Sequence, residues 1–230
     1  MGLTNADRGT AARSDALRTK RDIARTWFSH RSPQTMLVGV AVVVVLRLLV
    51  GGYGWADLVV VAVTLPLIGG VEWVLHLVLL HAPDTSFRMR VLGTGVGHRE
   101  HHLDPLDVGW IMLGPIDAFV FLFLIAGWTA LWSLPLLWIL DSALLAPFLT
   151  ATLAAYLSLA HYEWVHLLVH TRYRAKTRYY RRLTTNHRLH HYRNERYWLG
   201  VTSNLGDRIL GTYPADKGDV PLSETARTLG

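Results

Sequence analysis

Two copies of the pattern His-x-x-His-His are the groups in this 230-residue sequence with the clearest chemistry. On a helix, residues at i, i+3 and i+4 lie on one face, so each copy crowds three imidazoles together. Protonated imidazoles at that spacing repel one another, whereas neutral imidazoles bind iron, zinc, copper and nickel well. The repeated pattern therefore predicts a metal centre. The two copies are His98, His101 and His102, and His187, His190 and His191.

Two histidine pairs at the ends of apolar segments extend the predicted ligand set. His166 and His170 are four residues apart and share one helix face. His76 and His81 are five apart, or about 140° on an ideal helix, so either the helix unwinds there or the two serve different metals. One ion takes roughly four to six ligands, so the set suits two ions. The predicted ligands are His76, His81, His98, His101, His102, His166, His170, His187, His190 and His191.

Carboxylates near the histidines are candidates for outer partners, which orient metal-bound imidazoles and offset the metal charge. Glu72 lies one turn before His76, and Glu163 shares the face of His166. These two glutamates can instead pair with arginine, and that alternative stays open. The remaining histidines, His30 and His161, are predicted to be structural. The six candidate acids are Glu72, Glu163, Asp104, Asp107, Glu195 and Asp207.

The composition favours a membrane protein. Half of the chain, 51%, is apolar, the net charge is +6, and the absence of cysteine excludes disulfides and thiolate metal ligands. In a membrane protein, excess positive charge belongs to cytoplasmic loops and lipid headgroups, so we expect no nucleic-acid partner.

Four apolar segments predict the fold. A membrane span needs about 20 residues, so the first apolar run, from Met36 to Val50, must extend to about Trp55, with Arg47 snorkelling near its far end. The other spans are predicted over 58–80, 115–140 and 144–169, with Pro135 and Asp141 marking a tight hairpin. The sequence therefore predicts an all-α integral membrane protein with four transmembrane helices and a cytoplasmic, histidine-rich helical cap.

The charge distribution predicts the orientation. Every Lys and Arg except Arg47 lies in the N-terminal region, in the 82–114 loop or after the fourth span. The opposite turns, 51–57 and 133–142, contain none, which is the asymmetry of the positive-inside rule. We therefore expect both termini and the metal site on the cytoplasmic side of a bacterial inner (plasma) membrane.

Three regions follow from these patterns. Residues 1–34 form a basic arm, either an amphipathic helix on the membrane surface or a solvated extension. Residues 35–214 form a membrane-embedded domain that carries all the predicted metal ligands, and residues 215–230 form a polar C-terminal tail. The segment after Tyr213 is predicted to be poorly ordered.

Residues 71–214 resemble the fatty acid hydroxylase/sterol desaturase superfamily of integral-membrane di-iron enzymes. The strings that carry the resemblance are EWVLHLVLLHAP, GHREHHLDPLDVGWIMLGP, YEWVHLLVH and NHRLHHYRNERYWLGVTSNLGDRILGTYP. The forms VHLLVHTRY and HREHH are also similar to bacterial carotenoid ring hydroxylases.

The resemblance implies a lipid oxygenase. It implies two Fe ions in the histidine set, with O₂ as co-substrate, and hydroxylation of an unactivated C–H bond of a fatty acyl chain, sterol or carotenoid. Zinc can replace iron in purified protein, because the Irving–Williams order does not favour Fe(II). Electrons would come from a separate ferredoxin- or cytochrome-type donor. The alternatives are a carotenoid ring hydroxylase, a lipid desaturase, a non-catalytic membrane metal-binding or transport protein, and a b-type cytochrome.

Overall fold

The computed structural model describes residues 12–83, 85–87 and 94–229, and within them the chain is helical, without a strand. The chain divides into two compact units, each treated separately. The histidine unit comprises the described parts of 12–26, 69–112 and 164–229, and the helical unit comprises 27–68 and 113–163. All ten predicted metal ligands belong to the histidine unit.

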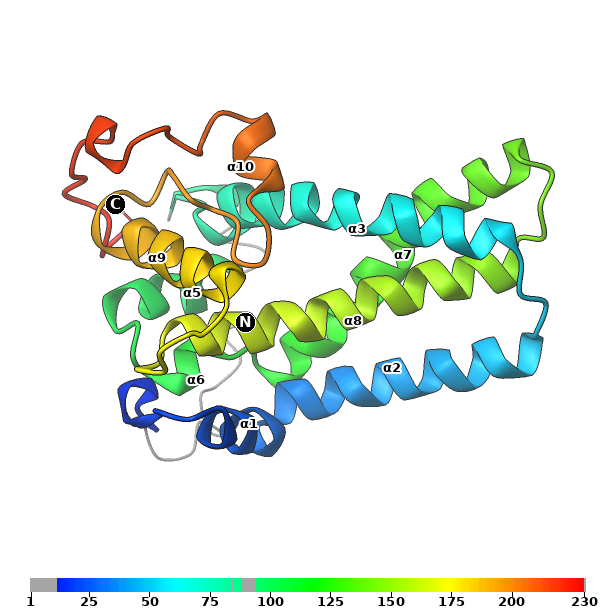
Figure 1. Ribbon diagram of the computed structural model, residues 1–230, viewed down its shortest axis with the longest axis horizontal. Coiled ribbons are helices and arrows are strands. Elements are labelled where there is room, and N and C mark those ends of the chain that lie inside the picture. The colour runs from blue at the N-terminus through cyan, green and yellow to red at the C-terminus, as the bar shows by residue number, and fades with distance from the viewer. Residues whose placement is uncertain (1–11, 84, 88–93, 230) are drawn as a thin grey trace. The chain divides into compact units, whose positions relative to one another are not determined.

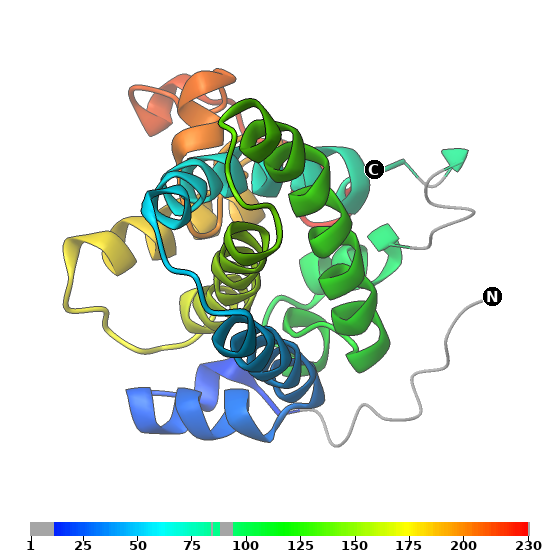
Figure 2. The ribbon, with the colours of Figure 1, turned by 90° about the vertical axis from the view of Figure 1, so that its right-hand side faces the viewer.

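The helical unit is built around α8 (Leu145–Val169), whose first 19 residues lie among α2, α3 and α7 (Figure 2). The neighbours are α2 (Arg31–Val50), α3 (Trp55–Leu75) and α7 (Pro115–Ile139). One apolar cluster joins Val43, Leu122 and Tyr156, and a second joins Val60, Leu137 and Ala151. Small and aromatic side chains thus let α8 contact three helices at once.

The histidine unit contains shorter elements (Figure 1). The end of α3 continues into a π-helical turn, η2 (His76–Leu80), and the end of α8 also belongs here. The other elements are η1 (Ser14–Ala16), the start of α1 (Lys20–Ser29), α5 (Thr94–Leu103), α6 (Val108–Ile111), α9 (Arg178–Tyr192), α10 (Leu205–Ile209) and η3 (Lys217–Asp219).

Three helical segments are long and apolar enough to cross a membrane, namely Arg31–Val50, Trp55–Leu80 and Val108–Ile139. We expected a fourth in α8, which has 25 residues but does not meet the same criterion. Its sequence carries hydroxyl, histidine and glutamate side chains, and much of its surface in the helical unit is buried against protein. A helix that is surrounded by other helices needs fewer apolar side chains than a helix that faces lipid.

Two predicted boundaries are wrong. The first span extends toward the N-terminus rather than to Trp55, because Gly51 ends α2 with a φ of +62°, a conformation that favours glycine. Pro135 lies inside α7 and does not end it. The turn that follows α7 instead contains Asp141, with a φ of +48°.

The sequence predicted that Arg47 snorkels, and this prediction is wrong. The side chain is 4% exposed and is held within the helical unit. Its Nη2 lies 2.8 Å from Asp57 Oδ1, its Nε donates to Thr150 Oγ1 at 2.7 Å, and Tyr53 stacks on the guanidinium. Nη1 also donates to the carbonyl of Gly51 at 2.5 Å. The cation therefore closes the turn between α2 and α3.

The N-terminal arm is a packed element over the described residues 12–29, and the solvated alternative is wrong there. Ile23 and Trp27, on the apolar face of α1, are 0% and 5% exposed. In the histidine unit, the Ser14 hydroxyl donates to the carbonyl of His170 at 3.0 Å, and the Ser14 amide donates to Leu106. Residues 1–11 lie outside the described part.

We predict that Asp57→Ala destabilises the protein, because it leaves a buried guanidinium without its counter-charge. The expected loss is about 3 kcal/mol, which lowers the melting temperature by roughly 6 to 12 °C in a chain of this size. Thermal unfolding in detergent measures the effect. The exposed Glu224→Ala serves as control, and equal melting temperatures for the two variants would contradict the prediction.

Candidate metal centre

The ten predicted ligands meet in two clusters of five histidines. Within each cluster, one ligand nitrogen per residue can be chosen so that all five lie within 4.8 Å of one another. That spacing suits a metal ion placed between them. Cluster A contains His76, His81, His98, His102 and His190; cluster B contains His101, His166, His170, His187 and His191.

Each His-x-x-His-His pattern is divided between the clusters, although the sequence had suggested one shared face. On α5, His98 and His102 belong to cluster A and His101 to cluster B. On α9, His187 and His191 belong to cluster B and His190 to cluster A. In each pattern, the i, i+4 pair therefore belongs to one cluster and the histidine between them belongs to the other.

The π-helical turn brings His76 and His81 together. The His81 amide donates to the His76 carbonyl at 3.0 Å, an i→i+5 bond. That wider turn places residues five apart on one face, and the two ring centroids are 4.8 Å apart. The helix thus unwinds, and both histidines join cluster A.

The two clusters are built alike. Each takes a histidine pair from the end of an apolar helix, an i, i+4 pair from one short helix and a single histidine from the other short helix. The His102 and His191 rings, one from each cluster, stack with centroids 4.1 Å apart. The clusters are therefore adjacent, which is the arrangement needed for two neighbouring ions.

The clusters hold uncharged imidazoles. Nine of the ten histidines are buried and His81 is half-buried. Burial, followed by repulsion from neighbouring imidazoles, lowers the pKa of His101 and of His187 well below the usual value. Burial lowers the pKa of His102 to about 3. At neutral pH these rings are in the form that binds metals.

The hydrogen bonds direct free nitrogens into the clusters. Nδ1 of His76, His102 and His190 faces the carbonyls of Leu199, Ala226 and Tyr197, at 2.5, 2.8 and 2.9 Å. A carbonyl only accepts, so each Nδ1 carries the proton and each Nε2 keeps a lone pair. Nε2 of His102 and of His190 is buried without a hydrogen-bond partner among the described residues. Lone pairs gathered in this way fit a divalent cation.

For four of the ten histidines, a backbone carbonyl rather than a predicted carboxylate accepts the hydrogen bond from Nδ1. His166 Nδ1 likewise faces the Ile111 carbonyl at 3.0 Å. Because every residue has a carbonyl, these partners leave no signal in the sequence. Several of the candidate carboxylates instead contact backbone amides or hydroxyls.

Four candidate acids accept hydrogen bonds from segments that contain these carbonyls or lie next to them in the sequence. Glu72 and Asp207 accept hydrogen bonds from residues 199–202. Glu195 accepts from the Thr225 hydroxyl, and Asp107 accepts from Gly109 at the start of α6.

The other two candidates act elsewhere. Asp104 pairs with Arg13 on the surface. In the helical unit, Glu163 accepts from the Ser32 hydroxyl at 2.5 Å and from the Leu113 amide at 3.0 Å. Among the described contacts of these six acids, arginine is a partner only for Asp104.

The C-terminal tail is part of the site, and the prediction that it is poorly ordered is wrong for the described residues. Val220 and Ala226 are buried, and the Ala226 carbonyl orients His102. Arg227 donates to the carbonyls of His102 and Leu103 at 2.9 and 2.7 Å. The tail therefore secures the end of α5 against movement.

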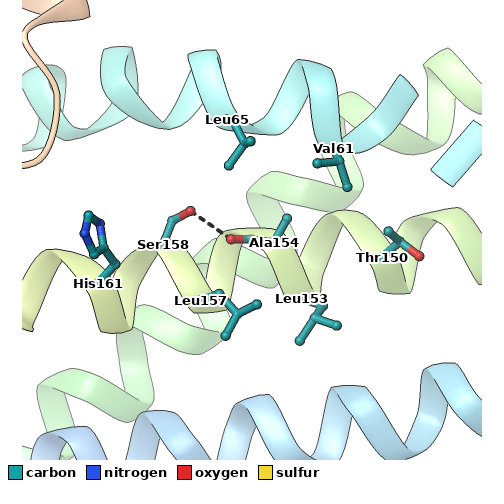
Figure 3. Close-up of a pocket in the computed structure, with 8 residues that line it drawn as sticks. All are labelled: Val61, Leu65, Thr150, Leu153, Ala154, Leu157, Ser158 and His161. Carbon is teal, nitrogen blue, oxygen red and sulfur yellow. Dashed lines mark hydrogen bonds between the residues drawn. The ribbon is translucent and has the colours of Figure 1, made fainter. Parts of the chain in front are cut away.

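His161 lies outside both clusters and lines a groove in the helical unit (Figure 3). The groove has a volume of about 410 Å³ and runs between α3 and α8. His30, the other histidine predicted to be structural, places Nδ1 3.2 Å from the Ser32 hydroxyl. The groove residues are Val61, Leu65, Thr150, Leu153, Ala154, Leu157, Ser158 and His161.

Comparisons with known proteins identify the fold and the family of the chain. The solved structure described as full-length scs7p, with only its hydroxylase domain visible, matches with a TM-score of 0.63 and 22% identity. The match covers 84% of this chain and 68% of that one, and at this identity it shows a shared fold. A search of curated proteins gave no significant match. The family model for fatty acid hydroxylase matches residues 58–212, about two thirds of the sequence, so the chain belongs to the fatty acid hydroxylase family.

Proposed function

We propose that this protein is an O₂-dependent lipid hydroxylase whose two five-histidine clusters each bind one iron ion. The observation that carries the proposal is the meeting of ten imidazoles in two adjacent clusters. Membership of the fatty acid hydroxylase family supports the reaction class. When bound, two iron ions supply the redox chemistry by which O₂ hydroxylates an unactivated C–H bond.

The protein's own residues hold and orient the ions. The ten histidines supply neutral nitrogen ligands, and backbone carbonyls fix four of the rings through Nδ1. Burial of both clusters limits access of water, which protects a reactive centre from side reactions. Cysteine plays no part, because the chain has none.

We further propose a four-span topology in which α8 is the fourth span. Its 25 residues are long enough to cross a bilayer, although its composition is less apolar than that of the other three. The distribution of Lys and Arg supports a cytoplasmic position for the termini and the histidine clusters. A bacterial inner membrane is consistent with that orientation.

The proposed substrate is a membrane lipid, with its hydrocarbon chain in the groove between α3 and α8 (Figure 3). Leu65 is 56% exposed and Leu157 is 50% exposed, so the groove offers an apolar surface to hydrocarbon. Its residues on α8 recur at intervals of three and four, from Thr150 to His161. In the sequence, His161 precedes the cluster B ligand His166 by five residues.

The exposed basic surface that begins before α9 suits an acidic electron donor of the ferredoxin or cytochrome type. The opposite face of α9 carries three predicted ligands, so a donor bound here would be about one helix diameter, roughly 10 Å, from the clusters. Glu195, the only acidic residue in this stretch, is buried. The exposed cations are Arg172, Arg174, Lys176, Arg178, Arg181, Arg182, Arg188 and Arg196.

We predict that His101→Ala and His190→Ala each abolish lipid hydroxylation, because each removes a ligand from a different cluster. The loss should exceed about 100-fold, beyond the 10- to 100-fold cost of losing an outer partner. Mass spectrometry of total lipids and pigments, scored for a gain of one oxygen, measures it in membranes with equal amounts of protein. The control His161→Ala should keep its full metal content. Wild-type turnover in either ligand variant would refute the proposed centre.

A second prediction concerns the groove. Ala154→Trp should fill it and lower hydroxylation of long-chain lipids by at least about tenfold, the effect of roughly 1.4 kcal/mol of lost binding, while metal content stays unchanged. The matched control is Ala41→Trp, at an exposed position of α2 that does not line the groove. If both tryptophan variants hydroxylate lipid equally well, the hydrocarbon chain does not occupy this groove.

A further inference from the structure

We propose that Glu72 and Asp207 are positioning residues for one metal site only, the site in cluster A. They act through residues 197–202, which we call the carbonyl loop, and this inference rests on the proposed two-ion function. The loop joins two histidines that come from different elements, His76 in η2 and His190 in α9. Neither carboxylate touches an imidazole among the described contacts.

The loop presents two carbonyls to cluster A. The Leu199 carbonyl lies 2.5 Å from His76 Nδ1, and the Tyr197 carbonyl lies 2.9 Å from His190 Nδ1. Each bond holds the proton on Nδ1, fixes the ring plane and leaves Nε2 as the ligand atom. If the loop shifts, both rings lose their orientation together.

Two buried carboxylates bind the amide side of the same loop. Asp207 accepts from the amides of Leu199 and Gly200 at 2.9 and 2.8 Å. Glu72 accepts from the amides of Val201 and Thr202, the latter at 2.8 Å. Four consecutive N–H groups thus point toward carboxylates, and charge-assisted bonds of this kind are about twice as strong as neutral ones.

Side-chain hydroxyls complete both carboxylate sites. Asp207 also accepts from the Thr212 hydroxyl at 2.6 Å, and Glu72 from the Thr202 hydroxyl at 2.6 Å. Asp207 is fully buried and Glu72 is 9% exposed. Neither forms an ion pair among the described residues, so amides and hydroxyls are the described partners of both carboxyl groups.

Two glycines, Gly200 in the loop and Gly206 in α10, lie where a larger side chain would clash with neighbouring atoms. A Cβ added at Gly200 would lie 1.8 Å from the Ser203 carbonyl oxygen and 2.9 Å from Asp207 Oδ2. A Cβ at Gly206, next to Asp207, would lie 2.6 Å from Trp73 Cβ. Glycine at these two positions lets the loop and α10 approach α3 closely enough for both carboxylates to reach the amides.

The other oriented histidines depend on different segments. In cluster B, His166 Nδ1 faces Ile111. In cluster A, His102 Nδ1 faces the Ala226 carbonyl. Ala226 lies in the C-terminal tail and has no described hydrogen bond with Glu72 or Asp207. Loss of either carboxylate should therefore weaken cluster A through His76 and His190 and leave cluster B unchanged.

The test measures Zn²⁺ binding to the purified full-length protein with a chelator that buffers the free metal. We expect two ions per wild-type chain. Asp207→Asn should lower the affinity of one site by about 10- to 100-fold, so that one ion remains at a free Zn²⁺ level that fills both wild-type sites. Glu72→Gln should behave alike. Asp216→Asn, which removes a carboxylate cap from an exposed turn, should retain two ions.

Variants that lack one cluster identify which site is weakened. In a His101→Ala/His170→Ala background, which leaves cluster B three histidines, the remaining ion is in cluster A, and adding Asp207→Asn should remove it. In a His102→Ala/His190→Ala background, which leaves cluster A three histidines, the remaining ion is in cluster B, and the same addition should change nothing. Equal loss in both backgrounds, or two ions retained in Asp207→Asn, would overturn the inference while leaving the proposed function intact. Fewer than two ions in the wild type would refute the proposed function instead.

Discussion

The structure depends on the gathering of ten imidazoles, nine of them buried, in one compact unit. Two neutral imidazoles can share a hydrogen bond, but five nitrogens within 4.8 Å of one another cannot all be satisfied in this way. Protonation does not help, because burial and mutual repulsion lower the pKa of the rings outside the membrane-spanning helices. A divalent cation in each cluster would resolve the constraint, since every ring would then have a partner for its lone pair.

This constraint explains why irregular segments surround the histidines. The π-helical turn aligns His76 with His81, and the loop after α9 and the C-terminal tail supply carbonyls to Nδ1 atoms. The Ser14 hydroxyl bonds the His170 carbonyl, so the N-terminal segment contributes as well. Regular helices place the ligands in approximate position, and these irregular segments fix the orientation of individual rings. The same division is expected of metal sites in general, where outer partners determine tautomer and ring plane.

The meeting of the ten histidines could be predicted from sequence because histidine spacing carries a direct geometric meaning. The same reasoning failed for the division of each His-x-x-His-His pattern, since that depends on where α5 and α9 meet other helices. It also failed for the outer partners: Tyr197, Leu199 and Ala226 act through their backbones, which no side chain reveals. Apolar runs predicted the helices well, but Arg47 was placed wrongly because its partners, Asp57 and Thr150, come from other helices. The role of the six candidate acids as outer partners of the metal ligands stays a prediction, and so does the fourth span.

The most direct test of the two-cluster account is an anomalous-scattering map from crystals of the metal-loaded protein, recorded at the absorption edge of the bound metal. The account predicts two separate peaks in each chain, one surrounded by the cluster A nitrogens and the other by the cluster B nitrogens. A single peak shared by all ten histidines, or peaks whose ligands are carboxylates, would contradict it.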